Sequence, residues 1–245
     1  MFATGSPGKH LFTIFGTPVF GHWTVLLLIF LLGQGELRAF GWIGLAATAL
    51  AVVAGLLVHE FGHVYAAKTN GFRSYVVLGG MGAYTASEGE SRGWRGIWLS
   101  VAGPCAGFVF WAVCWFGFAP AGALQSGALF EVGNAFSPWR VVMDHGDVDV
   151  TGGDVLWVQL CWINLVWGIF NLMPIVPLDG GHVVEHLLRM RMRRAAAERL
   201  ASIVSLVVIV LILGLLWQLF GTIPIFSLLI LGMMGLQNYE RIRGL

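Results

Sequence analysis

Two histidines and a glutamate lie close together in the segment His59-Glu60-Phe61-Gly62-His63. On a helix, residues four apart share one face, so His59 and His63 would present two imidazoles to one point, with Glu60 beside them. Two neutral imidazoles can hold Zn²⁺, and a third protein ligand leaves one coordination position for water. A carboxylate next to such an ion can accept the proton of that water. The spacing therefore predicts a hydrolytic zinc site.

The surroundings of this segment are unusual for ionisable side chains. The segment lies in an apolar run from residue 41 to residue 67, where polar groups are costly to bury and commonly mark function. Only 7 His and 13 acidic residues occur among 245 residues, so chance is a weak explanation for the spacing of His59, Glu60 and His63. A buried, hydrogen-bonded His/Glu cluster without catalytic function is the alternative.

A third candidate metal ligand, Asp179, lies in a segment that breaks a helix, Asn171-Leu172-Met173-Pro174-Ile175-Val176-Pro177-Leu178-Asp179-Gly180. Pro174 and Pro177 cannot continue a helix, and Gly180 permits a close approach of backbone. Asp179 is thereby released from helical geometry. We expect it at the same depth as the two histidines, where it would complete a three-ligand zinc site.

The composition is that of an integral membrane protein. Hydrophobic residues make up 57% of the chain and charged residues 11%, and the mean hydropathy is +0.79. The formal charge of +1, without a sustained basic face, argues against nucleic acid as a partner. Cys105, Cys114 and Cys161 all lie in apolar segments, which favours packing over a disulfide or metal role.

Six apolar stretches approach the roughly 20 residues that cross about 30 Å of hydrocarbon. They cover about residues 19–32, 41–67, 97–118, 155–172, 201–220 and 223–236. The expected fold is an all-α polytopic membrane protein with about six transmembrane helices, forming a single domain over residues 1–245. The longest extramembrane loop covers about residues 119–154. Its acidic segment, residues 144–149, could bind a cation, but a solvated loop explains it more simply.

A glycine-rich segment at residues 76–84 is too short to cross a membrane and too rich in glycine for a stable helix. We expect extended, re-entrant backbone near residues 74–86, which is tolerated at membrane depth only under a cover of protein or in a wet cavity. An exposed strand edge there could pair with an extended peptide. Gly79, Gly80 and Gly82 are therefore candidate substrate-binding positions. A cytoplasmic surface hairpin is the alternative.

The distribution of Lys and Arg predicts the orientation of the spans. Of the 14 Lys and Arg residues, all but Arg38 and Arg140 fall at the two ends of the chain or in the loops after spans two and four. Because positive residues remain in the cytoplasm, both termini are expected to be cytoplasmic. Span two then places His59 and His63 within the membrane, nearer its cytoplasmic side.

A competing zinc motif occurs at His182-Val183-Val184-Glu185-His186, which has the inverted H-x-x-E-H pattern. That pattern needs a further carboxylate ligand downstream, where only Glu198 and Glu240 remain. We interpret the match as coincidence, with His186 on an interfacial helix that leads into an Arg-rich loop.

Because of its two segments at residues 59–63 and 171–180, the chain resembles the site-2 protease family of intramembrane zinc metalloproteases. Its H-E-F-G-H segment matches the zinc motif of that family, and residues 171–180 match the N-x-x-P-x-x-P-L-D-G pattern. The resemblance implies zinc ligation by His59, His63 and Asp179, with Glu60 as the general base. It also suggests that Asn171 helps to hold the substrate or the developing oxyanion.

The resemblance further implies regulated intramembrane proteolysis, which is hydrolysis of a peptide bond within or near a transmembrane segment of a membrane protein. A membrane-tethered regulator such as an anti-sigma factor is the expected substrate, in a bacterial inner membrane. His22 and Asn164 are candidates to line a path for water. The chain looks like a minimal member, without a PDZ domain or C-terminal regulatory domains.

Three other functions fit the sequence less well. A membrane metal-ion transporter or metal-binding protein predicts ligands spread along the spans and inverted repeats, neither of which is visible. A catalytically inactive scaffold would be expected to lack Glu60. Another class of membrane protease with the H-E-x-x-H motif would use a downstream Glu as third ligand, rather than an Asp after a double-proline break.

Overall fold

A computed structural model of the chain describes residues 8–79, 82–89, 91–119, 129, 138–139, 142 and 150–244. The chain divides into two compact units. The first unit spans residues 1–89 and 102–168, and the second spans residues 90–101 and 169–245. The predicted acidic segment at residues 144–149 lies outside the described residues.

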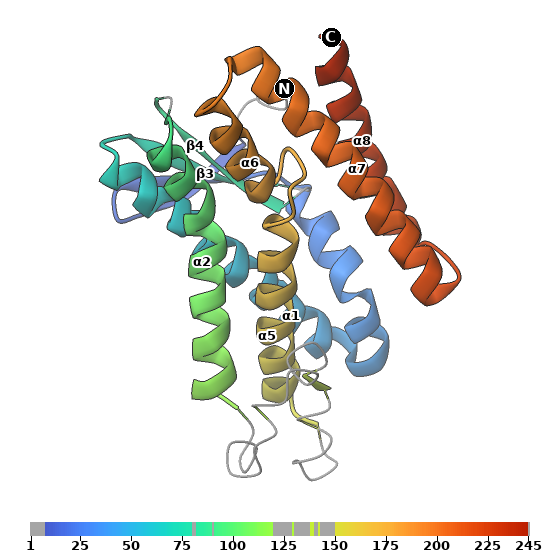
Figure 1. Cartoon of the computed structure of the whole chain (residues 1–245). Helices are drawn as coiled ribbons and strands as arrows, with labels where there is room; N and C mark the ends of the chain where they lie inside the picture. Colours follow the sequence, from blue (N-terminus) through green and yellow to red (C-terminus); the bar gives the residue numbers. More distant parts are fainter. Residues whose placement is uncertain are drawn as a thin grey trace. The chain divides into compact units, whose positions relative to one another are not determined.

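A four-stranded sheet belongs to the first unit, with the strand order β1-β2-β3-β4 (Figure 1). The strands are β1 (Lys9–Ile14), β2 (Thr17–Gly21), β3 (Ser74–Gly79) and β4 (Gly82–Ser87). The pairs β1–β2 and β3–β4 are antiparallel, whereas β2 and β3 are parallel. Extended backbone near residues 74–86 is thus confirmed.

The sheet is larger than the sequence predicted. The N-terminal hairpin was not expected, and residues 19–21 belong to β2 rather than to the first apolar span. The reason is that β2 aligns with β3 by a long-range pairing, Val19 opposite Val76, which leaves no local pattern in the sequence. The fold is therefore mostly helical with a small sheet, rather than all-α with one short β segment.

The longest helix, α1 (Val25–Thr69), consists of two arms that meet at Gly41. Gly41 is the one non-helical residue inside α1, with φ 64° and ψ −150°. Because L-residues with a side chain rarely adopt this conformation, glycine permits the bend there. Figure 1 shows the two arms of α1, in blue and cyan, running in different directions. They overlap the first two predicted apolar stretches, but residues 33–40, which were expected to form a loop, are helical and end the first arm.

Two further helices, α2 (Trp94–Gly117) and α5 (Gly152–Asn171), contribute most of their length to the first unit and lie side by side there. The indole nitrogen of Trp157 donates a hydrogen bond of 2.9 Å to the Cys114 carbonyl, and the Trp115 and Trp157 rings stack. Cys114 and Cys161 are free and buried in this aromatic cluster, as predicted for packing residues. Cys105 is free and exposed.

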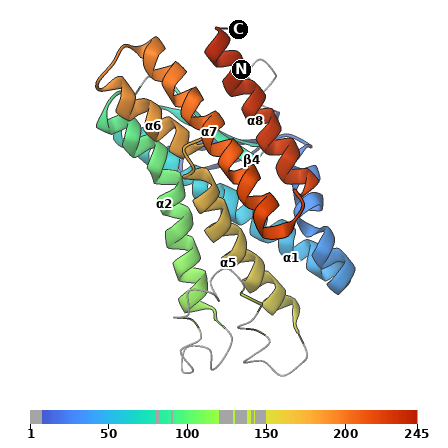
Figure 2. The same ribbon diagram turned by 45° about the vertical axis from the view of Figure 1, so that its right-hand side comes forward.

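The second unit contains α6 (Asp179–Arg189), α7 (Arg194–Phe220) and α8 (Ile225–Arg243). Helices α7 and α8 run side by side (Figure 2). The turn between them begins at Gly221, whose left-handed conformation ends α7 as a glycine cap. The core of this unit consists of Ile175, Leu178, Ile209, Leu231 and Met234.

Among the described residues, four helices are long and apolar enough to cross a membrane, namely α1, α2, α5 and α7. The chain is therefore an integral membrane protein. The arrangement of six spans stays a prediction, because α1 contributes two arms within one continuous element and α8 is not one of the four.

Candidate metal centre

His59, Glu60 and His63 lie on the second arm of α1, in the first unit, and their side chains are 4%, 3% and 9% exposed. The Nε2 atoms of the two histidines are 3.2 Å apart. Because a zinc–nitrogen bond is about 2.0–2.1 Å long, two nitrogens at this separation can bind one ion at close to a tetrahedral angle. The helical spacing has therefore produced the predicted pair of imidazoles, and their geometry fits a metal ion.

The histidine pair is packed against α2 through small residues. A Cβ added to Gly62 would overlap the carbonyl oxygen of Ala102, and a Cβ added to Gly103 would overlap the ring of His63. Only glycine at these two positions lets the helices approach this closely. The small residues in this part of α2 thus determine where the His63 ring can lie.

Replacement of Gly103 by Ala is expected to displace the His63 ring and lower zinc affinity by at least about 10-fold, the smaller effect seen when partners of metal ligands are lost. Zinc affinity would be measured by competition with a fluorescent chelator. Gly117→Ala is the matched control, because Gly117 lies on the same helix with no neighbouring atom within 4 Å. Equal zinc affinity in both variants would contradict this role of Gly103.

The carboxylate of Glu60 is held by the sheet. Thr85, on β4, donates a hydrogen bond of 2.7 Å from its hydroxyl to Glu60 Oε2, and the same hydroxyl lies 3.2 Å from the Glu60 carbonyl oxygen. The contact limits the rotation of the carboxylate beside the two imidazoles. Sequence reasoning missed Thr85, since a threonine in a strand is ordinary and it lies 25 residues from Glu60.

If Glu60 is the general base that the sequence predicts, Thr85→Val should lower kcat for hydrolysis at this centre with little change in KM, because the variant keeps its shape but loses the hydroxyl that orients Glu60. The expected loss is on the order of 10-fold, a part of the 10²–10⁴-fold that a positioned general base contributes. Thr85→Ser retains the hydroxyl and should restore most of the rate. Equal rates for the Val and Ser variants would show that the hydroxyl is not needed.

A narrow pocket in the first unit reaches His59. Its volume of about 10 Å³ is close to what one water molecule requires. His59 and Asn164 bring polar atoms to a lining that is otherwise largely apolar. Asn164 is 3% exposed and donates a hydrogen bond to the Leu160 carbonyl. The structure thus places Asn164 beside the same pocket as His59, while its role in guiding water stays a prediction.

His22, the other residue predicted to guide water, lies just after β2 and is exposed. Its backbone N–H donates a hydrogen bond of 2.8 Å to the Leu78 carbonyl, and its Nδ1 is 2.8 Å from the Thr24 hydroxyl. These contacts connect the start of α1 to the end of β3.

The predicted substrate-binding glycines lie at the β3–β4 hairpin. Gly79 ends β3 and Gly82 begins β4, whereas Gly80 lies outside the described residues. Gly82 has a φ of 116°, and a Cβ there would lie 2.7 Å from the ring of Trp167. β4 is at one end of the strand order, so among the described residues one of its edges pairs with no other strand.

In the second unit, Asp179 is the first residue of α6, so the prediction that the double-proline break releases it from helical geometry is wrong: a new helix begins directly after the break, with Leu178 as its N-cap. Close backbone packing holds this helix start, since a Cβ on Gly180 would overlap the Leu172 carbonyl and one on Gly181 would overlap the Val176 nitrogen. Asp179 is partly buried. Asn171, also partly buried, is the last residue of α5.

Two polar side chains fix the loop that precedes Asp179. The Val176 N–H donates a hydrogen bond of 2.9 Å to the Ser205 hydroxyl on α7, and the Val176 carbonyl accepts one of 2.6 Å from the Asn238 amide on α8. Both side chains are fully buried. Sequence reasoning missed both, because they are 29 and 62 residues from Val176.

The inverted motif at residues 182–186 lies on α6. Glu185 is buried and pairs with Arg189 at 2.6 Å and with Arg241 at 3.0 Å. These ion pairs account for the Glu185 carboxylate without a metal, in agreement with the interpretation of this motif as coincidence. His186 packs against α2, where a Cβ on Gly96 would overlap its ring.

Comparison with known proteins shows which protein family this chain resembles. Residues 47–215 match the model of peptidase family M50. A zinc metalloprotease of Methanocaldococcus jannaschii is 26% identical over 216 residues, which cover 84% of this chain and 53% of that protein. Rip3 of Mycobacterium tuberculosis, whose name also assigns it to the zinc metalloproteases, is 28% identical over 208 residues. That match covers 78% of this chain and 47% of Rip3. The chain thus spans about half the length of the curated relatives it matches.

A solved structure shares the fold. The site-2 protease from Methanocaldococcus jannaschii matches with a TM-score of 0.60 and 21% sequence identity. The match covers 96% of this chain and 94% of that one.

Proposed function

This chain belongs to peptidase family M50, and from that premise we propose that it hydrolyses a peptide bond within or near a transmembrane segment of a membrane protein. The observation that carries the proposal is the buried cluster on α1, in which two imidazole nitrogens lie 3.2 Å apart beside a carboxylate held by Thr85. Buried ionisable groups in an apolar helix are costly, and a hydrolytic centre gives them a use.

The proposed cofactor is one zinc ion, with His59, His63 and Asp179 as ligands. Each of the three offers one donor atom. Two imidazoles and a carboxylate form a set that catalytic zinc sites use, with a fourth position open. The names of two relatives as zinc metalloproteases support this choice. Zinc bound there would polarise the scissile carbonyl and make water more acidic.

Glu60 is the proposed general base and acid. Its carboxylate would accept a proton from the attacking water and pass it to the leaving nitrogen. Thr85 would keep one carboxylate oxygen fixed during both transfers. The family pattern that contains Asn171 supports a role for its amide in holding the substrate carbonyl, and the burial of Glu60 would exclude bulk water from the reaction.

The free edge of β4 is the proposed docking site for the substrate backbone. A transmembrane helix hides its carbonyls in internal hydrogen bonds, so it must unwind before a peptide bond can be attacked. Pairing with β4 would replace the lost backbone bonds. Gly79, Gly80 and Gly82 would leave room for the substrate side chains beside this edge.

The proposed topology has six spans, both termini in the cytoplasm and the metal nearer the cytoplasmic side. It is supported by the charge distribution, in which 12 of the 14 Lys and Arg residues lie at the chain ends or in loops that six spans would place on one side. A bacterial inner membrane and a membrane-tethered regulator, such as an anti-sigma factor, are the proposed location and substrate. Residues 1–245 would act as a single protease domain.

The test is cleavage of a purified transmembrane model substrate by the purified protein in detergent. We expect cleavage that stops with a zinc chelator and returns when zinc is restored. Cleavage products would be located by mass spectrometry, and the cut should fall within or next to the apolar segment. Cleavage that continues without zinc would contradict the proposal.

The rival function, transport of metal ions, is distinguished in proteoliposomes. A transporter would carry zinc across the bilayer and leave the model substrate intact. Zinc flux without cleavage would therefore replace the proposal by the rival.

A further inference from the structure

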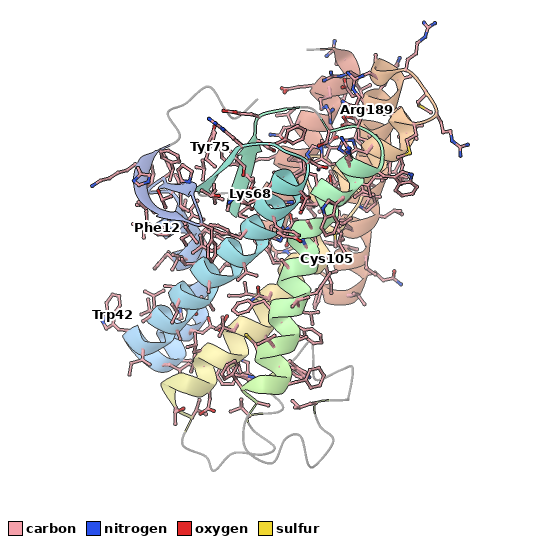
Figure 3. All side chains as sticks on the ribbon, turned by 90° about the vertical axis from the view of Figure 1, so that its left-hand side faces the viewer. Phe12, Trp42, Lys68, Tyr75, Cys105 and Arg189 are labelled. Carbon is pink, nitrogen blue, oxygen red and sulfur yellow. The ribbon has the colours of Figure 1, made fainter. Side chains whose placement is uncertain are left out.

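The pocket that reaches His59 lies between helices of the first unit. Residues from both arms of α1, from α2 and from α5 line it, and all of them belong to this unit. The pocket is partly open rather than sealed. In Figure 3, Cys105 marks the stretch of α2 that lies beside the second arm of α1, shortly before Gly107 in the pocket wall. The aliphatic side chains of the wall are those of Leu28, Leu32, Val52, Leu56 and Ile163.

Three glycines contribute to the pocket wall, and close packing explains two of them. A Cβ added to Gly55 would lie 3.1 Å from the amide oxygen of Asn164, and one added to Gly168 would lie 2.8 Å from the Phe108 ring. Gly107, on α2, is buried, yet no atom of another described segment lies within 4 Å of a Cβ added there. The space in front of Gly107 is therefore open, and helix packing does not require a glycine at this position.

The pocket is small. Its volume of about 10 Å³ admits a group near the size of a water molecule. A methyl group is of similar size, whereas an isobutyl or benzyl group is several times larger. The wall is also firmly packed, because Val52 and Ile163 are 2% and 6% exposed in the core of this unit, and packed interiors yield little. The pocket therefore fits a small side chain and excludes a large one.

The pocket lies beside the part of the first unit that is proposed to carry the chemistry. The imidazole of His59 forms part of its wall, and the Nε2 atom of that ring lies 3.2 Å from His63 Nε2. A peptide bond held at this histidine pair would have its neighbouring side chains within reach of the pocket. Successive side chains of extended backbone point to opposite sides, so only one of the two side chains that flank the bond can enter.

We propose that this pocket holds one of the two side chains that flank the cleaved peptide bond, and that it accepts Gly, Ala, Ser or Cys but not Leu or Phe. This role of the pocket rests on the proposed protease function and adds the class of substrate residue. The aliphatic wall suits a methyl group, and the amide of Asn164, which is 3% exposed, offers a polar partner to a hydroxyl. Transmembrane segments consist mainly of apolar residues, many of them large, so the pocket would restrict cleavage to the few positions that carry a small one.

The first test compares transmembrane model substrates that carry Gly, Ala or Leu in turn at each of the two positions flanking the cleaved bond. Cleavage by the purified full chain is measured as kcat/KM, and the cut is located by mass spectrometry. At one of the two positions, Leu should lower kcat/KM by at least about 10-fold relative to Ala, the lower end of what a single methylene contributes in a hydrophobic pocket. Ala and Leu have similar helix propensities, so unwinding of the substrate does not account for such a difference.

The second test reduces the pocket by one methyl group through Gly107→Ala. The added Cβ occupies open space, so it should not displace a neighbouring helix. We expect the ratio of kcat/KM for the Ala substrate to that for the Gly substrate to fall by at least about 10-fold. Because both substrates meet the same preparation, a loss of folded protein cancels in this ratio. Gly117→Ala is the matched control, since Gly117 lies in equally open space on α2 but outside the pocket lining, and its ratio should equal that of the wild type.

A third variant, Ile163→Val, makes the opposite change to the pocket. It removes a methyl group from the wall and is among the mildest substitutions in a protein interior. With a further substrate that carries Val at the selective position, the ratio of kcat/KM for Val to that for Ala should rise by about 10-fold.

The possible results can be told apart. Unchanged ratios in both pocket variants, with cleavage intact, would overturn the proposal. Equal slowing of the Ala and Gly substrates in Gly107→Ala would assign the pocket to the passage of water, and it would overturn the proposal as well. If the wild type cleaved none of the substrates, the proposed function itself would be contradicted and this role of the pocket with it. That result differs plainly from cleavage that ignores the size of the side chain.

Discussion

Replacement of Glu60 by Gln is expected to abolish cleavage of a transmembrane substrate while the purified protein keeps its zinc. Glutamine has nearly the shape of glutamate and can still accept the Thr85 hydrogen bond, but its amide cannot take a proton from water. The expected loss is about 10²–10⁴-fold in the single-turnover rate, the usual contribution of a general base. Zinc content, measured by atomic absorption, should remain one ion per chain, because His59 and His63 are unchanged.

Glu240→Gln is the control for this variant, since Glu240 is an exposed glutamate on α8. It should cleave at the rate of the wild type. A Glu60→Gln protein that retains zinc and still cleaves would remove Glu60 from the chemistry, whereas one that loses zinc would place Glu60 among the metal ligands.

Replacement of Asp179 by Ala is expected to remove both zinc and cleavage. Two imidazoles alone would hold the ion weakly, and the fall in affinity should exceed the 10–100-fold typical of losing a partner of a metal ligand. Zinc affinity would again be measured by competition with a chelator, and cleavage with the model substrate. Asp179→Asn keeps the size of the side chain at the start of α6, so it separates loss of the ligand from loss of local structure.

The control for this prediction is His186→Ala, which removes a histidine of the competing H-x-x-E-H segment. We expect this variant to retain zinc and cleavage, because Glu185 in that segment is already paired with two arginines. If His186→Ala lost zinc and Asp179→Ala retained it, the metal would belong to the second motif and the proposed site would be wrong.

The sequence predicted best those features that repeat along the chain or lie within a few residues of each other. Apolar runs indicated the helices that could span a membrane, and the spacing of His59 and His63 placed two imidazoles on one helix face. The prolines before Asp179 indicated where α5 would end, although the start of α6 at Asp179 itself was not predicted. Helical periodicity and helix breaking act over one or two turns, so they can be read locally.

The bend in α1 was predicted only in part from the sequence. The sequence predicts two apolar stretches separated by a loop at residues 33–40, whereas in the structure these residues are helical and the bend lies at Gly41 within one continuous element. A glycine permits the required conformation but does not require it. The sequence therefore indicated that the chain turns between the two stretches, and only the structure places the turn at Gly41.

Only the tertiary structure showed the contacts that hold the candidate site. The parallel pairing of β2 with β3, the hydrogen bond from Thr85 to Glu60, and the two bonds that hold Val176 all join residues far apart in the chain. Threonine, serine and asparagine have many possible partners, and a pairing between distant segments has no period along the sequence. Which partner each residue finds depends on how the helices pack, and this is why the sequence could propose the candidate site residues but not the contacts that support them.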